Sequence, residues 1–257
     1  MIDKGTAVLD WLMHRRNLRR WRKVARKAHG LSLSQLRIER GRARHLRHSL
    51  NEVISVADSR LALPMIGSNI FHKPHGTDWS WRPNLWCQPL AMPGMSTVAS
   101  KTRLGDVVTL YHDCEQSELT LRQVRNQSEA DLAPFGLRMD VFRFDGSFLS
   151  LLLDLPEQAM MGLQRRHLIR LDTIIELEKP IEIFIRLNIK HGPNTEQLVR
   201  ELPLHEDEIA VEFDLAYSNI NEKRVERAWV DLIFENPQMS QVIIRDLTFC
   251  RHPRAEF

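Results

Sequence analysis

The chain has 257 residues, of which 43% are hydrophobic and 27% charged, so its composition excludes a generally disordered protein. The net charge of +3 hides an asymmetry, because residues 1–60 carry 15 Lys or Arg against 5 Asp or Glu, whereas residues 61–257 carry 21 against 28. No window approaches the roughly 18 uninterrupted apolar residues of a membrane span, so no such span is expected.

The N-terminal residues are predicted to form a helical hairpin, with helices over 6–29 and 32–60. Apolar residues recur at helical spacing along the first helix and form one stripe, which comprises Trp11, Leu18, Trp21, Ala25 and Ala28. Gly30 stands where the first helix would stop. Ser32 followed by Gln35 is a capping-box pattern, which indicates the start of the second helix.

Both predicted helices are dense in basic residues, and the first is the denser. Its cluster comprises Arg15, Arg16, Arg19, Arg20, Arg22, Lys23, Arg26 and Lys27. Such density is typical of sites for anionic surfaces, acidic partners or phosphate backbones. We interpret it first as a solvated surface that docks on the acidic β domain, on a protein partner or on a second copy, and second as a peripheral contact to an anionic surface. Nucleic acid is not expected, because the charges are interpreted as surrounding the helix.

Residues 61–100 are rich in Pro, Gly and Trp and predict an irregular connector. Trp79, Trp81 and Trp86 lie close together in it. An indole ring can stack on a sugar ring, so these three residues are candidate ligand-binding side chains. Because large aromatic residues are usually buried, at least two of them are interpreted as packing residues. The His and Asp residues of this connector lack the paired spacing of a zinc motif such as CxxC or HExxH, so no metal site is predicted.

The remainder of the chain, 101–257, reads as strands in series. The predicted strands are 106–112, 118–125, 137–144, 147–154, 166–177, 181–190, 196–202, 208–217, 225–235 and 241–251. Apolar and polar residues alternate within the best of them, and Pro residues fall between them. The pattern predicts a mainly β fold: an antiparallel β-sandwich of jelly-roll type preceded by the basic α-helical hairpin of residues 1–60.

A polar loop follows the strictly alternating strand 181–190. Asn188, His191 and Asn194 offer the short donors and acceptors that suit sugar hydroxyls, and they complete the set of candidate ligand-binding residues. Turn chemistry alone also explains Gly, Pro and Asn in such a loop.

Catalytic motifs are hard to assemble from the sequence. There is no Walker loop, no G-x-G-x-x-G and no G-x-S-x-G elbow. Carboxylates on neighbouring strands, such as Asp140, Asp154, Glu182 and Glu212, would form a glycosidase pair only at the required separation. We therefore favour a protein without catalytic residues or cofactors, and a carbohydrate-active hydrolase remains the alternative.

Two segments resemble known β domains. The run from Trp229 to Pro237, together with 244–249, resembles the last strands of galactose-binding-like domains and carbohydrate-binding-module jelly rolls. The stretch 142–156 is similar to a central hairpin of the same domains, and the whole chain resembles a bacterial family of unknown function. The resemblance implies a non-catalytic glycan-binding or assembly module. A structural or adaptor protein, attached by its basic hairpin, is a further alternative.

The sequence also suggests where the protein works. Its N-terminus shows no apolar segment with a cleavage site of the kind that signal peptides carry. Its three cysteines are far apart and odd in number, which favours a reducing compartment over a disulfide framework. A cytoplasmic protein is therefore expected, either peripheral to a surface or part of a larger particle.

Overall fold

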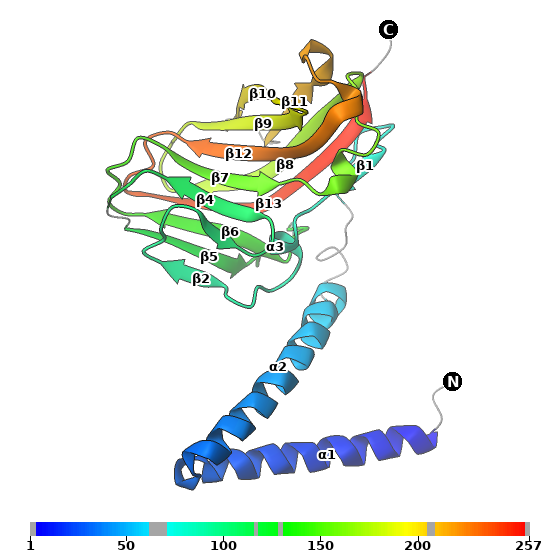
Figure 1. The fold of residues 1–257 in the computed structure, drawn as a ribbon, viewed down its shortest axis with the longest axis vertical. Coiled ribbons are helices and arrows are strands. Elements are labelled where there is room, and N and C mark those ends of the chain that lie inside the picture. The colour runs from blue at the N-terminus through cyan, green and yellow to red at the C-terminus, as the bar shows by residue number, and fades with distance from the viewer. Residues whose placement is uncertain (1–3, 62–70, 116–117, 128–130, 205–208, 255–257) are drawn as a thin grey trace. The chain divides into compact units, whose positions relative to one another are not determined.

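The computed structural model describes residues 4–61, 71–115, 118–127, 131–204 and 209–254. The chain divides into two compact units, Met1–Ile54 and Ser55–Phe257. The first unit is helical and the second is a β-sandwich (Figure 1). No helix in the described part of the chain is long and apolar enough to cross a membrane.

The N-terminal unit consists of α1 (Lys4–Lys27), a 3₁₀ turn (Ala28–Gly30) and α2 (Leu33–Leu61), whose last residues belong to the second unit. The capping box predicted between the helices is confirmed. The backbone N–H of Ser32 donates to Gln35 Oε1 at 3.3 Å, and the backbone N–H of Gln35 donates to Ser32 Oγ at 3.4 Å. These two bonds satisfy amides that the first turn of α2 leaves without helical partners. The side chain of Trp11, part of the predicted stripe, lies outside the described residues.

The second unit confirms the predicted antiparallel sandwich. Its strands are β1 (Trp79–Trp81), β2 (Gly94–Ser96), β3 (Thr102–Leu104), β4 (Val108–His112), β5 (Leu119–Arg125), β6 (Phe135–Val141), β7 (Leu149–Asp154), β8 (His167–Leu177), β9 (Ile183–His191), β10 (Asn194–Glu201), β11 (Ile209–Asp214), β12 (Val225–Phe234) and β13 (Ser240–Pro253). Each predicted run coincides with one strand from β4 to β13. One short helix, α3 (Asn84–Cys87), and 3₁₀ turns at Glu157–Ala159, Leu215–Tyr217 and Glu222–Arg224 complete the unit.

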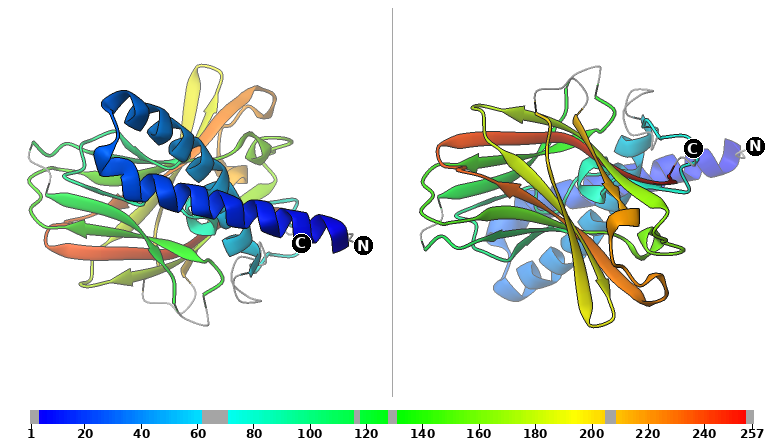
Figure 2. Two further views of the ribbon diagram at one scale, coloured as in Figure 1. Left: turned by 90° about the horizontal axis from the view of Figure 1, so that it is seen from below. Right: turned by 90° about the horizontal axis from the view of Figure 1, so that it is seen from above.

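Two sheets form the layers of the sandwich. One has the order β11-β8-β13-β6-β5-β2, with β1 also paired to β13, and the other has the order β10-β9-β12-β7-β4-β3. All strand pairs are antiparallel. Strands β9 and β10 form a long hairpin, which is yellow in Figure 2. Neighbouring strands in each sheet are mostly distant in sequence. They are therefore joined by crossover connections, as in a jelly roll.

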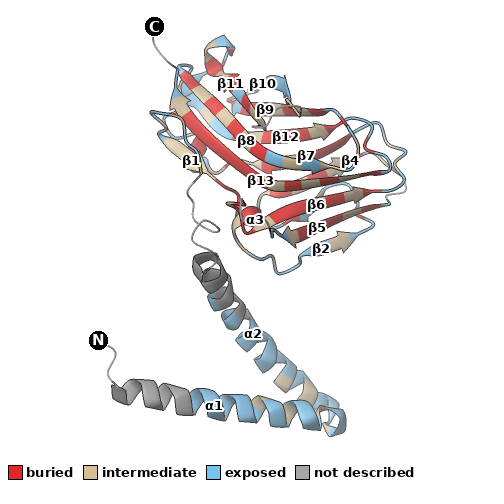
Figure 3. Cartoon of the chain, turned by 180° about the vertical axis from the view of Figure 1, so that it is seen from behind, coloured by how far each residue is buried: buried red, intermediate tan, exposed pale blue. Residues whose placement is uncertain are grey.

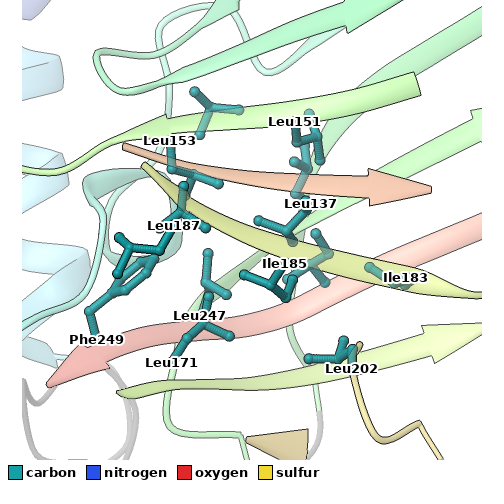
Figure 4. Close-up of a cluster of buried hydrophobic side chains, with 14 of the residues drawn as sticks. Leu137, Leu151, Leu153, Leu171, Ile183, Ile185, Leu187, Leu202, Leu247 and Phe249 are labelled. Carbon is teal, nitrogen blue, oxygen red and sulfur yellow. The ribbon is translucent and has the colours of Figure 1, made fainter. Parts of the chain in front are cut away.

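The core lies between the two sheets. Along β9, Ile183, Ile185, Leu187 and Ile189 are each at most 1% exposed, and the residues between them point to the outer face. Leu151 and Leu153 on β7 and Leu171, Leu247 and Phe249 on the opposite sheet fill the same space (Figure 4). Figure 3 shows these buried positions alternating along the strands. Period-two patterning thus decides which face of each strand is available for function.

Residues 71–100, predicted to be irregular, contain three short elements with long-range partners. Trp79, Ser80 and Trp81 pair with the far end of β13, and β2 pairs with β5. Trp86 in α3 is buried, and its indole N–H donates to the carbonyl of Ile244 at 3.0 Å. Local sequence patterns cannot predict these pairings. Strands β1 and β2 are too short to show alternation, and β1 and Trp86 have partners more than a hundred residues away.

An arginine clamp closes one end of the sandwich. Arg251 is buried, donates to the two carboxylate oxygens of Asp78 at 2.9 and 3.1 Å, and donates to the carbonyls of Ala159 and Met161. Burial would raise the pKa of Asp78, but the hydrogen bonds and charge of Arg251 outweigh it and lower the pKa. His167 Nε2 lies 3.8 Å from Asp78, and burial lowers the pKa of this imidazole.

His167 makes stability depend on pH. Because its pKa is lowered in the folded state, the unfolded chain binds a proton more readily, so the free energy of unfolding falls as pH drops below about 6.5. His167→Asn is expected to flatten this slope between pH 6.5 and 5. Urea unfolding followed by near-UV circular dichroism at each pH measures it. Equal slopes for the wild type and the variant would contradict the assignment.

Candidate functional site

The outer face of the β10-β9-β12-β7-β4-β3 sheet carries a shallow pocket of about 380 Å³. Its walls combine aromatic rings with polar side chains from five adjacent strands or their ends. The aromatic residues are Tyr111, Phe148 and Trp229, and the polar residues are Ser150, Arg186, Asn188, Gln197 and Asp231. Leu152 and Ile233 complete the lining. Aromatic surface with a few convergent polar groups is the usual composition of a small-molecule site.

Strand register brings these residues together. Trp229 on β12 lies opposite Asn188 on β9, and Asn188 lies opposite Gln197 on β10. Asp231, two residues beyond Trp229, lies opposite Arg186. Because side chains two residues apart share a face, β9 and β12 each send one residue to each of two neighbouring rows of the pocket.

Asp231 is the centre of a fixed polar network. It is 4% exposed, and its Oδ2 accepts hydrogen bonds from Arg186 Nε at 2.9 Å and from Asn188 Nδ2 at 3.0 Å. The Oδ1 of Asn188 in turn accepts from Gln197 Nε2 at 3.0 Å. Each link fixes the orientation of the next side chain, so the donors and acceptors of the network are held in place before any ligand arrives.

Trp229 lies beside this network and is half-buried. The guanidinium of Arg227 lies 5.0 Å from the centre of its ring, and Arg227 Nε donates to Asp154 at 3.0 Å. Two contacts therefore set the position of the indole: a cation–π contact and the ion pair that holds the cation. At the other end of the pocket, Phe148 is 44% exposed and Tyr111 is half-buried.

The charges in and around the pocket are balanced. Arg186 pairs with Asp231, Arg227 with Asp154, and Lys190 with Glu226 at 2.9 Å. A pocket whose neighbouring charges cancel in these three pairs offers hydrogen bonds without attracting ions of one sign. Such a face suits a neutral, hydroxyl-rich ligand.

Of the polar candidates predicted from the sequence, the structure brings Asn188 into the pocket. His191 is buried on the same strand, and its Nδ1 accepts from the backbone N–H of Asn221 at 3.3 Å. Asn194 is exposed at the β9–β10 turn, where it pairs with His191. These two residues lie beyond the lining of the pocket, near one end of the hairpin.

Of the three connector tryptophans, Trp79 and Trp81 belong to the opposite sheet, and Trp86 lies in α3, which packs against that sheet. Trp81 stacks on Phe249 with ring centres 5.6 Å apart, and both it and Trp79 are half-buried. Trp86 is 1% exposed, so neither face of its indole is open to a ligand. This arrangement agrees with the interpretation that most of these rings are packing residues.

The four carboxylates considered for a hydrolase do not meet. Asp140 and Glu212 lie on β6 and β11, with two strands between them, and Asp154 and Glu182 are on the other sheet. Trp229 lies opposite Asp154 and Phe234 opposite Ile183, so Asp154 and Glu182 are separated along the strands by about 20 Å. A glycosidase needs about 5–10 Å. No three His, Cys, Asp or Glu side chains in the described ranges are grouped as metal ligands.

Comparison with known proteins places the chain in a family. Residues 1–257 match the family described as "Family of unknown function (DUF6478)". The chain belongs to this family. No curated protein matches it.

Several solved structures align with parts of this chain. A family 11 carbohydrate-binding module from Clostridium thermocellum, in complex with a mixed-linked tetrasaccharide, is 12% identical, with a TM-score of 0.39 over 65% of this chain and 100% of that chain. The CBM22-1 xylan-binding domain of Paenibacillus barcinonensis Xyn10C is 9% identical, with a TM-score of 0.35 over 72% and 100%. The bacteriophage CBA120 tailspike protein 4 domain is 7% identical, with a TM-score of 0.40 over 60% of this chain and 21% of that chain. The resemblance predicted from the sequence to a family of unknown function is thus confirmed.

Proposed function

We propose that the protein binds a neutral glycan, without catalysis, on the outer face of the six-stranded sheet. The observation that carries the proposal is the Asp231 network beside a positioned Trp229. A flat indole packs against the C–H face of a sugar ring, while the half-buried Arg186 and the exposed Gln197 hydrogen-bond to its hydroxyls. Asn188 is buried and positions these two side chains through its bonds to Asp231 and Gln197. Fixed partners make binding less costly, because few side chains lose freedom when the ligand arrives.

The dimensions of the site favour an oligosaccharide over a single sugar. Five adjacent strands contribute to the pocket, from β10 with Gln197 to β4 with Tyr111. At about 4.8 Å per strand, the outer two are separated by about 19 Å. A chain lying across the strands would meet Trp229 and the Asp231 network at one part of the site and Tyr111 and Phe148 at another.

The proposal predicts that polysaccharides retard the protein during electrophoresis in native gels. We expect the full chain to be slowed by at least one of mixed-linked β-glucan, xylan, galactomannan and laminarin, and to be unaffected by the polyanion alginate. Trp229→Ala is expected to remove the retardation, because it deletes the stacking surface of the site.

Trp79→Ala provides the matched control for this experiment. Trp79 is also half-buried but lies on the opposite sheet, so its variant should be retarded like the wild type. Retardation lost in Trp79→Ala and kept in Trp229→Ala would place the ligand on the connector instead. No retardation by any neutral polysaccharide would contradict the proposed function.

A further inference from the structure

The described part of α1 is strongly two-faced. At 100° per residue, all eight basic residues of the cluster, from Arg15 to Lys27, fall within an arc of about 160°. Every one of them is exposed. The sequence-based interpretation that charges surround this helix is therefore wrong, because the basic residues, although dense in the sequence, occupy less than half of the helix circumference.

The other face of α1 carries apolar residues that are open to solvent, with the uncharged Asn17 and the weakly basic His14 between them. Met13, Leu18, Trp21 and Val24 lie within an arc of about 140° that contains no Lys or Arg among the described side chains. Met13 is 56% exposed and Leu18 is 42% exposed. The apolar stripe expected to be used in packing against the second helix is therefore left largely uncovered within the N-terminal unit.

Contacts between the two helices are concentrated near the turn. Arg20 pairs with Glu39 of α2 at 3.6 Å, and a hollow between the helices is lined by Val24, Leu31 and Ile38, among others. Further along α2, Leu50 and Val53 are 51% and 67% exposed. Exposed large apolar residues on a helix whose opposite face is basic need a partner that satisfies both faces.

We propose that α1 binds the surface of an anionic lipid membrane, lying in the plane of the interface. Lipid headgroups neutralise the basic face, and the acyl boundary receives Met13, Leu18 and Trp21. A nucleic acid would use the basic face alone and leave the apolar face in water. The proposal is independent of glycan binding, which involves the other unit.

Vesicle flotation of the full chain tests this proposal. The protein should float with vesicles of phosphatidylglycerol and phosphatidylcholine in equal parts, and not with phosphatidylcholine alone. Since each basic residue near an anionic surface contributes about five-fold to binding, the variant R19Q/K23Q/R26Q should bind about 100-fold more weakly. The matched control R122Q/R125Q/R143Q removes the same charge from exposed positions of the β unit and should bind like the wild type.

A second variant separates insertion of the apolar face into the interface from attraction by charge alone. M13Q/L18Q keeps every charge, uses residues that favour helices, and should still weaken flotation about ten-fold because two apolar side chains no longer enter the interface. Failure of the wild type to float with the anionic vesicles would overturn the proposal. So would undiminished flotation of M13Q/L18Q alongside loss in R19Q/K23Q/R26Q, since that result indicates attraction by charge alone, without insertion of the apolar face.

Discussion

Asp231→Leu is expected to weaken glycan binding about 100-fold. The substitution removes the acceptor shared by Arg186 and Asn188, so both side chains lose the orientation that the pocket needs. A hydrogen bond to a charged group contributes about 1.5–3 kcal/mol, and a loss of about 2.7 kcal/mol corresponds to 100-fold in Kd. Isothermal titration calorimetry with an oligosaccharide of the polysaccharide that retards the wild type measures the change.

A graded series makes the Asp231 experiment decisive. Asp231→Asn keeps the shape and one acceptor oxygen but loses the charge, so we expect about a ten-fold loss. Asp172→Leu is the matched control, because Asp172 pairs with Arg170 at 2.7 Å on the opposite sheet. Its affinity for the glycan should equal that of the wild type. Equal losses for the Asp231 and Asp172 variants would indicate a general effect on folding and contradict the assignment of the site.

Arg82→Ala should produce the largest loss of stability, about 3–5 kcal/mol in the free energy of unfolding. Arg82 and Asp246 are 5% and 7% exposed, and two hydrogen bonds of 2.9 and 2.8 Å join them. Burial raises the pKa of Asp246 even though Arg82 opposes the shift. Without Arg82 the carboxylate is left charged in a site that disfavours charge. Urea unfolding followed by near-UV circular dichroism measures the loss.

Three further measurements identify the buried charge as the cause of the lost stability. The double variant Arg82→Met with Asp246→Leu should recover most of the stability, because it removes both charges. Since the folded state favours protonated Asp246, the Arg82→Ala defect should shrink as pH falls through the raised pKa of that carboxyl. Arg138→Ala, which breaks the more exposed pair with Asp140, should cost less than about 1 kcal/mol. Equal costs for Arg82→Ala and Arg138→Ala would refute this account.

The strands could be predicted because the alternation of apolar and polar residues in each one indicates which of its faces is buried. The alternation from Ile183 to Ile189 requires only that one face of the strand meets a core, and it holds whichever strand lies beside it. Strand β1 could not be predicted in the same way. It is three residues long, and its place is set by pairing with Arg251 and its neighbours at the far end of the chain.

The pocket could be predicted only in part for the same reason. The sequence predicts Asn188 as a candidate because it is a short polar residue near a turn, whereas Trp229 and Asp231 lie within a run that predicts only a strand. The sequence does contain a signal, since Trp229 and Asp231 are two residues apart and therefore share one face of a strand. Its meaning depends on the register that places Arg186 opposite Asp231, and register between strands more than forty residues apart is a tertiary property.

The central claim is that glycan binds at Trp229, and the indole N–H signals of the six tryptophans test it most directly. A two-dimensional ¹H–¹⁵N spectrum is recorded as the oligosaccharide is added, and Trp229 is assigned from the signal missing in Trp229→Phe. The account predicts that the Trp229 signal shifts with saturation while those of Trp79, Trp81 and Trp86 stay in place. A stationary Trp229 signal, with movement at the connector tryptophans or at none, would contradict it.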